Sequence, residues 1–588
     1  MGSVSVTLAF GIGGAEMGEL ATGAELFLRT LQDRGVEYVF MNPGTDTYPV
    51  QEAFAKLRKA GEALPELLLC PFESLTSSAA QGYFLATGRA QVAFVHVDVG
   101  TANAAGSLND SKANRTPVVL CAGRSPVTIE AVPGGRSKYI NWLQDVPDQG
   151  MLVRNYTKNE QIAYRAAAIP RTMQRAFQVA ESDPAGPVYV TFPREALVEE
   201  TDLGGDIDAR RYPAVRAGSP NPEDVDTIAE WLLDAERPIV IAGYLGRDPS
   251  AVASLVELSE LAAVAVVEYR GRVNFPLTHP HHLGFRPEVA TESADLLIVI
   301  EHDVPYVPLD GDPEQGSKLV HIGHDPFFET VQTWGFPSDL GVRADARRTL
   351  EAVRDAVAAR LDDATRARIG HRAARLRAEH ESWSDAAWTP LEAPTGQPVS
   401  PSLLGQTLAE LLPENVAVFE EAVTSGNPIL LQLKDLGPDR LFRNGGSYLG
   451  WGLGAAAGFG LARGNDIPVA LCGDGSFLFA VPSAVLWFLR TNRIPVLALV
   501  VNNAVYNSVR LAGRDGYPGG AQATHGYVAA EFGEPPHADE IARACGVAGF
   551  RARDGAELRR CLHEALGVVR SGLPALVTVD TTMADRPM

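Results

Sequence analysis

The sequence predicts an α/β protein made of three doubly wound domains, each built on a parallel sheet. Its 588 residues exceed what a single hydrophobic core organises, which indicates about three or four domains. Short apolar runs alternate with helical patterns along most of the chain, as in parallel sheets whose two faces are covered by helices. Two polar, proline-containing stretches separate this pattern into three blocks.

The first block spans residues 19–190 and follows an N-terminal extension of residues 1–18. A first helix is expected from about residue 22. The strand-like runs of this block are residues 38–40, 67–69, 92–95, 118–120 and 188–190. Helical patterns lie between them, so this block predicts a parallel sheet with its helices on both faces.

The second and third blocks repeat the alternation. A linker of residues 191–222 leads to a central block, 223–365, and a second linker, 366–401, leads to a third block, 402–583, with a short tail, 584–588. The strand-like runs are residues 238–241, 264–267, 296–300 and 319–322 in the central block, and 469–472, 496–501 and 575–579 in the third. The first and third blocks are similar in size and pattern, which hints at an old duplication.

Composition excludes several classes of partner. The net charge of −21 and the pI near 5.1 argue against binding to nucleic acid or to an anionic membrane. The five cysteines are scattered and form no CxxC motif, which indicates a reducing compartment without structural disulfides or a zinc site. No stretch reaches the roughly 18 continuous apolar residues of a membrane span, and no basic signal region precedes the first helix. We therefore expect a cytoplasmic protein.

The most informative stretch lies in the third block. Gly473, Asp474 and Gly475 follow one strand-like run, a helical stretch begins near Ser476, and the next apolar run ends just before Asn503. This βαβ order places the aspartate and the asparagine at the carboxyl ends of parallel strands, where ligands bind in doubly wound sheets. A carboxylate, an amide oxygen and nearby carbonyls suit Mg²⁺, and glycines before a helix N-terminus suit a phosphate. A diphosphate bridged by Mg²⁺ would fit here.

Three polar residues follow strands in the first block. Thr45 ends an Asn-Pro-Gly-Thr turn, and Glu73 and His96 each come directly after an apolar run. The three should gather on one edge of the sheet. Taken alone, Glu73 could simply be an acid stabilised by a helix N-terminus, and His96 could be a hydrogen-bonded structural residue.

Together these motifs resemble a known family. The stretch from Gly473 to Asn503 resembles the GDG…NN signature of thiamine-diphosphate (ThDP) enzymes. Across nearly the whole chain, the order of motifs resembles ThDP-dependent decarboxylases and acetohydroxyacid-synthase-like enzymes, and the first block looks most like benzoylformate decarboxylase. The resemblance implies a pyrimidine-binding (PYR) domain, a central domain and a diphosphate-binding (PP) domain. It also implies a lyase or transferase that cleaves or forms a carbon–carbon bond next to a carbonyl, acting as a decarboxylase, a carboligase or both on a small 2-oxo acid.

The resemblance assigns roles in the first block. Glu73 corresponds to the glutamate that contacts the aminopyrimidine of the cofactor and supports its proton relay. His96 falls on an active-site histidine, and Thr45 falls on a small hydroxyl residue beside the substrate. Asp98 stands where relatives carry small residues, so it could be scaffold or could alter the pocket.

The resemblance also assigns the third-block residues. Mg²⁺ would be held by Asp474, Asn503 and the backbone carbonyl of Val505. The other cofactor-binding residues would be Thr424, Ser425, Leu449, Gly450, Gly473, Gly475, Ser476 and Tyr506, with Leu449 as the apolar wedge under the bent cofactor. Tyr506, Ser508 and Val509 would line the substrate pocket. Decarboxylases of small 2-oxo acids carry a glutamate at the position of Val509, so its absence argues against a pyruvate-decarboxylase mechanism and suggests an apolar wall.

The family also implies an assembly. Each active site would lie between the PYR domain of one subunit and the PP domain of its partner, in a homodimer or, as a dimer of dimers, a homotetramer. The central block shows no convincing nucleotide-binding motif, so FAD is not expected. His302, which ends a strand there, is a further candidate for the substrate pocket.

Three alternatives stay open. A 2-hydroxyacyl-CoA lyase or oxalyl-CoA-type decarboxylase needs a basic groove and often a C-terminal lid, whereas this chain ends soon after its last strand. A Rossmann-type dehydrogenase is suggested by a sequence near GxGxxA at residues 450–455, but no acidic residue closes the following strand in the expected way. An inactive regulatory subunit would lack the glutamate or the metal ligands, and both are present. The acyl donor and acceptor are not identified by these patterns.

Overall fold

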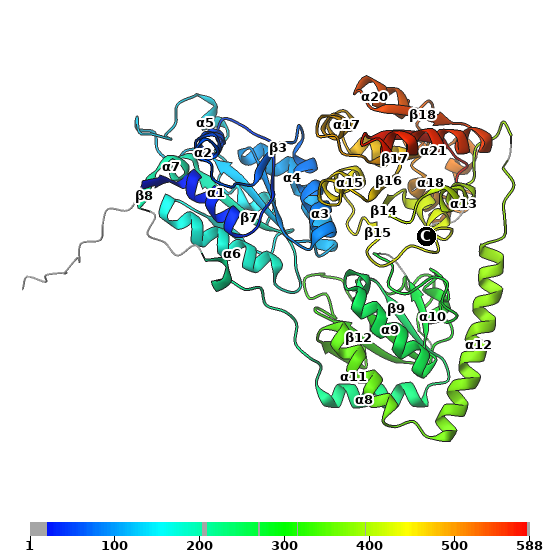
Figure 1. Ribbon diagram of the computed structural model, residues 1–588. Coiled ribbons are helices and arrows are strands. Elements are labelled where there is room, and N and C mark those ends of the chain that lie inside the picture. Colours follow the sequence, from blue (N-terminus) through cyan, green and yellow to red (C-terminus); the bar gives the residue numbers. More distant parts are fainter. Residues whose placement is uncertain (1–19, 203–207, 269–270, 314–315, 394, 585–588) are drawn as a thin grey trace, which may run out of the picture.

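The computed structural model describes residues 20–202, 208–268, 271–313, 316–393 and 395–584. These ranges form three α/β domains, coloured blue to cyan, green, and yellow to red along the chain (Figure 1). Three parallel sheets carry them, which confirms the predicted fold class. None of the helices in these ranges is both long enough and apolar enough to cross a membrane.

The first domain is a six-stranded parallel sheet in the order β3-β2-β4-β5-β7-β6. Its strands are β2 (Tyr38–Met41), β3 (Glu66–Leu69), β4 (Gln91–Val95), β5 (Val118–Arg124), β6 (Glu160–Ile162) and β7 (Val188–Pro193). Its main helices are α1 (Gly23–Asp33), α2 (Tyr48–Lys59), α3 (Glu73–Thr87), α4 (Val97–Ala113) and α6 (Ile169–Glu181). Helix α1 begins where expected because Thr22 and Glu25 form a reciprocal capping box.

Part of the stretch predicted as a linker, residues 191–222, belongs to this first domain. Helix α7 (Arg194–Val198) follows β7 directly, and β8 (Glu200–Asp202) then pairs antiparallel with β1 (Leu20–Thr22). Strand β6 and this small ribbon are short and half exposed, so they carry little apolar signal. The linker prediction was wrong over these residues because strand pairing between the two ends of the domain is not visible in local sequence.

The central domain is a five-stranded parallel sheet in the order β10-β9-β11-β12-β13. Its strands are β9 (Pro238–Ala242), β10 (Ala265–Glu268), β11 (Leu296–Ile300), β12 (Lys318–Gly323) and β13 (Leu340–Arg343). Its main helices are α8 (Pro222–Asp234), α9 (Pro249–Ala262) and α11 (Ala346–Ala358).

One long helix joins the central domain to the third. Helix α12 (Asp363–Ala387) runs along the edge of the molecule and occupies most of the stretch predicted as the second linker, residues 366–401 (Figure 1). Its sequence is highly charged, but Ile369, Arg372, Leu376 and His380 recur at helical spacing and are buried. This narrow buried stripe explains why a polar segment is an ordered helix.

The third domain repeats the first. Its six parallel strands have the order β15-β14-β16-β17-β19-β18. They are β14 (Val416–Glu421), β15 (Leu441–Arg443), β16 (Ile467–Gly473), β17 (Leu497–Asn502), β18 (Ala548–Ala552) and β19 (Ala575–Asp580). The principal helices are α13 (Pro401–Leu411), α15 (Trp451–Ala462), α16 (Asp474–Phe479), α17 (Pro482–Thr491), α18 (Asn507–Gly516), α20 (Ala538–Ala544) and α21 (Gly555–Arg570).

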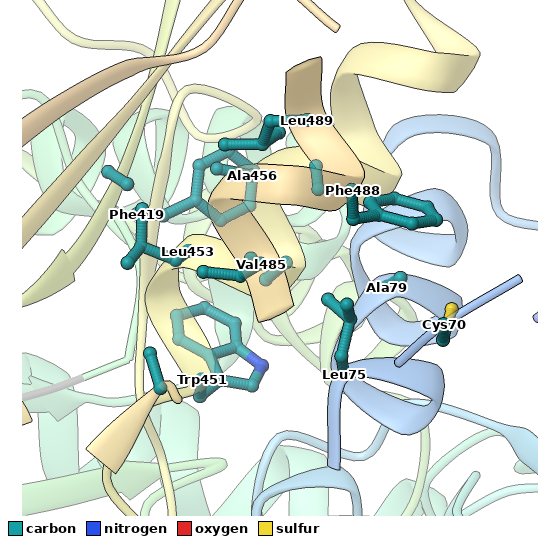
Figure 2. Close-up of a cluster of buried hydrophobic side chains, with 14 of the residues drawn as sticks. Cys70, Leu75, Ala79, Phe419, Trp451, Leu453, Ala456, Val485, Phe488 and Leu489 are labelled. Atoms are coloured by element: carbon teal, nitrogen blue, oxygen red, sulfur yellow. The ribbon is translucent and has the colours of Figure 1, made fainter. Parts of the chain in front are cut away.

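The first and third domains meet where α3 packs against α15. Figure 2 shows Leu75 and Ala79 of α3 facing Trp451 and Leu453 of α15 in one buried apolar cluster. Glycine allows this close approach, since a Cβ atom on Gly82 would lie 1.8 Å from the carbonyl oxygen of Ala455. The contact fixes the two domains of one chain to each other.

Candidate active site

A single carboxylate joins two turns at the carboxyl edge of the third sheet. Asp474 is the first residue of α16, and its side chain accepts hydrogen bonds from the backbone N–H groups of Gly475 (2.7 Å), Asn503 (3.1 Å) and Ala504 (2.7 Å). Ala504 has a φ of +60°, a conformation that L-residues adopt at a cost. The turn after β16 and the turn after β17 are therefore held together by this carboxylate.

A cavity of about 260 Å³ opens at this edge. Its lining includes the predicted residues Thr424, Ser425, Leu449, Gly473, Asp474, Gly475, Ser476, Asn503, Val505, Tyr506, Ser508 and Val509. All the residues that line it come from the third domain. The structure thus brings together residues that lie on four different turns of the sequence.

The chemistry of this cavity fits a diphosphate and a hard cation. The side-chain oxygen of Asn503 accepts a hydrogen bond from the N–H of Val505 (3.1 Å), which fixes the amide in place. The buried hydroxyl oxygen of Ser425 has no hydrogen-bond partner in the described part of the chain. The same part contains no cluster of three His, Cys, Asp or Glu side chains that could hold a metal. The donor set is therefore one carboxylate with an amide and carbonyls, which suits Mg²⁺ rather than zinc.

Glu421, a residue that the sequence analysis missed, supports the loop of Leu449. Its carboxylate accepts hydrogen bonds from the N–H groups of Gly450 (3.0 Å) and Gly452 (3.1 Å) at the start of α15, where a helix favours negative charge. Its backbone carbonyl accepts a hydrogen bond from the hydroxyl of Ser476 (2.9 Å). Burial raises the pKa of Glu421 to about 7, against these hydrogen bonds. Glu421 could have been predicted from the sequence, because it is an acid at the end of a buried apolar run.

Gly450 does not line the cavity, but it shapes the loop that does. Its φ is +97°, and a Cβ atom there would lie 2.6 Å from the backbone nitrogen of Ala480. This position therefore requires glycine, and Leu449 beside it lines the cavity.

The equivalent edge of the first domain carries ionisable groups. Glu73 is the first residue of α3, and its carboxylate accepts a hydrogen bond from the side-chain amide of Asn103 (3.1 Å). His96 lies between β4 and α4, and Thr45 is exposed in the turn after β2. The three predicted residues thus all follow strands that are neighbours in the sheet.

His96 has two partners that the sequence analysis missed. Its Nδ1 atom contacts the carboxylate of Asp46, and its Nε2 atom lies 2.8 Å from the side-chain nitrogen of Gln144. Burial lowers the pKa of His96, but the hydrogen bond that the ring donates to Asp46 and the negative charges of Asp46, Asp98 and Glu73 outweigh burial and raise it. Asp46 directly follows the predicted Thr45, so an acid just after a strand was a usable signal in the sequence. Gln144 immediately follows a short helix, and nothing in the local sequence marks it.

His302 does not lie at either edge. It is 2% exposed and is packed against Gly243 inside the central domain, and it does not line the third-domain cavity. A larger cavity, of about 510 Å³, lies elsewhere, at the junction of the three domains, with Arg115, Arg247 and Arg272 in its wall.

Comparison with known proteins identifies the three domains. The first matches the model "Thiamine pyrophosphate enzyme, N-terminal TPP binding domain" over residues 21–152. The second matches the central domain of the same enzymes over residues 225–353, and the third matches the C-terminal TPP binding domain over residues 429–579.

Individual relatives align along most of the chain. The sequence is 25% identical to benzoylformate decarboxylase of Pseudomonas aeruginosa over 575 residues, covering 94% of this chain and 97% of that protein. It is 24% identical to a probable acetolactate synthase large subunit of Methanocaldococcus jannaschii, covering 92% of this chain and 90% of that one. The fold is similar to that of a thiamine diphosphate-dependent 4-hydroxybenzoylformate decarboxylase from Rhodococcus jostii, with a TM-score of 0.78, 22% identity, and coverage of 96% of this chain and 100% of that one.

Proposed function

Because this chain belongs to the thiamine pyrophosphate enzyme family, as its motifs predicted, we propose that it binds ThDP with Mg²⁺ and acts on a 2-oxo acid. The reaction is cleavage or formation of the carbon–carbon bond next to the carbonyl. The observation that carries the proposal is the third-domain cavity, where Asp474 and Asn503 meet the loop of Leu449. ThDP, when bound, supplies the nucleophilic carbon and the electron-accepting ring for this bond change.

In this proposal the third domain holds the cofactor. Asp474, Asn503 and the carbonyl of Val505 would hold Mg²⁺, since the three residues line one cavity and their oxygens suit a hard cation. Thr424 and Ser425 bind the diphosphate, together with the N–H groups at the start of α16. Gly473, Gly475, Ser476 and Tyr506 line the same space, and Leu449 would pack against the cofactor there.

The first domain moves protons. Asn103 orients the carboxylate of Glu73, which would hold a proton for the pyrimidine ring of bound ThDP. His96 exchanges a proton with the substrate through Nε2, because Nδ1 is taken by Asp46. Thr45, which is exposed beside this pair, contacts the substrate.

The proposed site needs groups from both edges. The cavity that holds the cofactor is lined by third-domain residues, whereas Glu73 and His96 lie on the first domain. We therefore propose that the PYR edge of one subunit covers the PP cavity of its partner, in a homodimer or a homotetramer made of two such dimers.

The pocket wall favours an apolar substrate side chain. Val509 is 59% exposed at the cavity, with Tyr506 and Ser508 beside it, and none of the three is a charged residue. The relatives include benzoylformate decarboxylase, which is named for an aromatic 2-oxo acid. We propose that the enzyme decarboxylates an aromatic or branched 2-oxo acid. The alternative reaction is carboligation, which forms a carbon–carbon bond at the same position.

A substrate screen tests the proposal. The full-length protein is stripped of metal and cofactor and then incubated with benzoylformate, pyruvate, branched-chain 2-oxo acids or indole-pyruvate, with and without ThDP and Mg²⁺. We expect release of CO₂ that requires both additions and is faster with benzoylformate than with pyruvate. Absence of CO₂ and of any new carbon–carbon product from every acid would overturn the proposal.

A further inference from the structure

His96 is held at both ring nitrogens. Nδ1 contacts the Asp46 carboxylate, and Nε2 lies 2.8 Å from the side-chain nitrogen of Gln144. Asp46 is only 4% exposed, whereas the His96 side chain keeps 22% of its surface exposed. The pair therefore has a buried end at Asp46 and an accessible end at the imidazole.

The surrounding backbone is built to admit this pair. A Cβ atom on Gly44 would lie 2.0 Å from Nδ1 of His96, and a Cβ atom on Gly123 would lie 1.7 Å from a carboxylate oxygen of Asp46. Any other residue at either glycine would push the pair apart. The two glycines lie at the carboxyl ends of β2 and β5, on the two sides of β4, which precedes His96. Three neighbouring strand ends thus contribute to one contact.

Asp46 also holds the backbone after His96. Its second carboxylate oxygen accepts a hydrogen bond from the N–H of Val97 (3.3 Å). Val97 has a φ of +26°, which is unfavourable for a β-branched residue. Strained residues of this kind persist where surrounding contacts over-determine them, and they cluster at active sites. One carboxylate thereby fixes both the imidazole and the turn that carries it.

We propose that Asp46 is the residue that positions His96 for proton transfer in the reaction proposed above, on which this inference rests. The carboxylate accepts a hydrogen bond from Nδ1–H, which selects the tautomer and leaves Nε2 to exchange the proton. The amide N–H of Gln144 donates to Nε2 of the neutral ring, which fixes the ring until a substrate takes the place of the amide.

The electrostatic surroundings of His96 agree with this role. The titratable groups that face it are Asp46 in the turn after β2, Asp98 on α4 and Glu73 on α3. The segment that carries Gln144 contributes Asp145, which is paired with Arg136. Of the facing carboxylates, Asp46 alone is hydrogen-bonded to the ring, whereas one oxygen of Asp98 has no hydrogen-bond partner in the described chain. Neutralising Asp46 or Asp98 should lower the pKa of His96, but only Asp46 also orients the ring.

A matched pair of substitutions tests the proposal on the full-length protein. Asp46→Asn and Asp98→Asn each remove one charge near His96, and only the first removes the carboxylate that holds Nδ1. The pKa of His96 is measured in each by mass spectrometry of imidazole C2-hydrogen exchange, without substrate. We expect Asp46→Asn to lower it more than Asp98→Asn does. Should Asp46→Asn fail to fold, Asp46→Ser, which is smaller, takes its place.

Kinetics supply the second measurement. Asp46→Asn should lower kcat by about 10²-fold, the cost of misplacing a reacting group, while KM changes little. The limb of the pH profile that reports His96 should move to lower pH, and Asp46→Glu should restore part of the activity. Equal effects of Asp46→Asn and Asp98→Asn on kcat and on the pKa of His96 would overturn the proposal and leave only a general charge effect.

The two measurements separate this inference from the proposed function. If the wild type decarboxylates 2-oxo acids but the pKa of His96 is unchanged in Asp46→Asn, the positioning role fails and the function stands. If the wild type turns over none of the acids while Asp46→Asn still lowers the pKa of His96, the proposed function fails and the Asp46–His96 coupling stands.

Discussion

The first and third domains are the same scaffold with different turns. Their sheets have equivalent strand orders, so β2, β3, β4, β5, β6 and β7 correspond in turn to β14, β15, β16, β17, β18 and β19. Strand β4 is followed by His96 and β16 by Asp474, at the same place in each sheet. The turn after β2 contains Asp46, whereas the turn after β14 contains Thr424 and Ser425.

The difference lies in what each edge presents. The first-domain edge carries the ionisable side chains Glu73, Asp46 and His96, which can move protons. The third-domain edge carries one carboxylate, amide and hydroxyl oxygens and backbone N–H groups, which can hold an anion and a cation. In doubly wound sheets the fold sets the edge at which ligands bind, and the turn residues decide which chemistry that edge can perform.

The equivalence extends to the contact between the domains. Helix α3 follows β3, α15 follows β15, and these two corresponding helices pack against each other (Figure 2). We therefore expect separable effects from substitutions at the first-domain edge, at the third-domain edge and at the contact between the two domains.

The largest effect is expected at the first-domain edge. Glu73→Gln keeps the shape and the hydrogen bond with Asn103 but cannot exchange a proton, so turnover should fall by about 10²–10⁴-fold. ThDP affinity should change much less than turnover, because glutamine can still hydrogen-bond to the pyrimidine and the proposed diphosphate and Mg²⁺ contacts lie on the other edge. Steady-state kinetics and a cofactor titration on the same variant check this. Near-normal turnover would place the essential carboxylate elsewhere.

The next effect concerns the third-domain edge. Asp474→Ala removes the carboxylate that would bind Mg²⁺ and that joins two turns, so ThDP affinity should fall by about 10- to 100-fold, as expected for lost interactions with a charged group. Excess Mg²⁺ and ThDP should partly restore turnover. Calorimetric titration of the metal-free protein measures the affinity.

Asp466 provides the matched control for that titration. It immediately precedes β16, at the opposite end of the strand from Asp474, and is paired with Arg440. Asp466→Ala should leave ThDP affinity unchanged. An equal loss of affinity in both variants would show that the effect is a general weakening of the domain.

A smaller effect is expected at the contact between the helices. Gly82→Ala would place a methyl group 1.8 Å from the carbonyl oxygen of Ala455, so α3 and α15 must separate. Overpacking of this kind costs about 1–3 kcal/mol, and the Tm should fall. Gly370→Ala in α12 is the control, because its Cβ meets open space and should stabilise the helix by up to about 1 kcal/mol. A Tm for Gly82→Ala at or above the wild-type value would contradict the close packing.

The smallest effect is a pH dependence where α4 meets the loop that precedes α15. Burial and the charge of Glu421 raise the pKa of Asp110, on α4, to about 9. The folded protein therefore keeps this proton where the unfolded chain has lost it, so stability falls as pH rises from about 4 towards 9. For one proton, the free energy of unfolding can change by no more than about 1.4 kcal/mol per pH unit.

Asp110→Asn should remove that contribution. The asparagine side chain is neutral at every pH, so the Tm of this variant should fall less than that of the wild type between pH 6 and pH 9. Thermal unfolding at several pH values measures the two slopes. Parallel slopes would mean that Asp110 is ionised in the folded protein.

Local sequence was enough to predict most strands of the three sheets and the residues that line the third-domain cavity. Buried parallel strands appear as apolar runs, so those followed by Glu73, His96 and Asp474 were predicted within a residue or two. The residues around the third-domain cavity were predictable because the GDG…NN pattern and its neighbours are close in sequence to the strands that carry them. Short, half-exposed strands such as β6 (Glu160–Ile162) lacked that signal.

Only the tertiary structure decided which residues meet. Asp46 and Gln144 lie about 50 residues before and after His96 in sequence, Glu421 reaches the start of α15 from another strand, and α3 meets α15 across two domains. His302 ends a strand as the candidates do, yet the fold buries it in the central domain. The sequence by itself determined the strands and the turns at their ends, because periodicity and turn chemistry are local. Contacts between those ends depend on strand order and helix packing, which join residues that no local pattern connects.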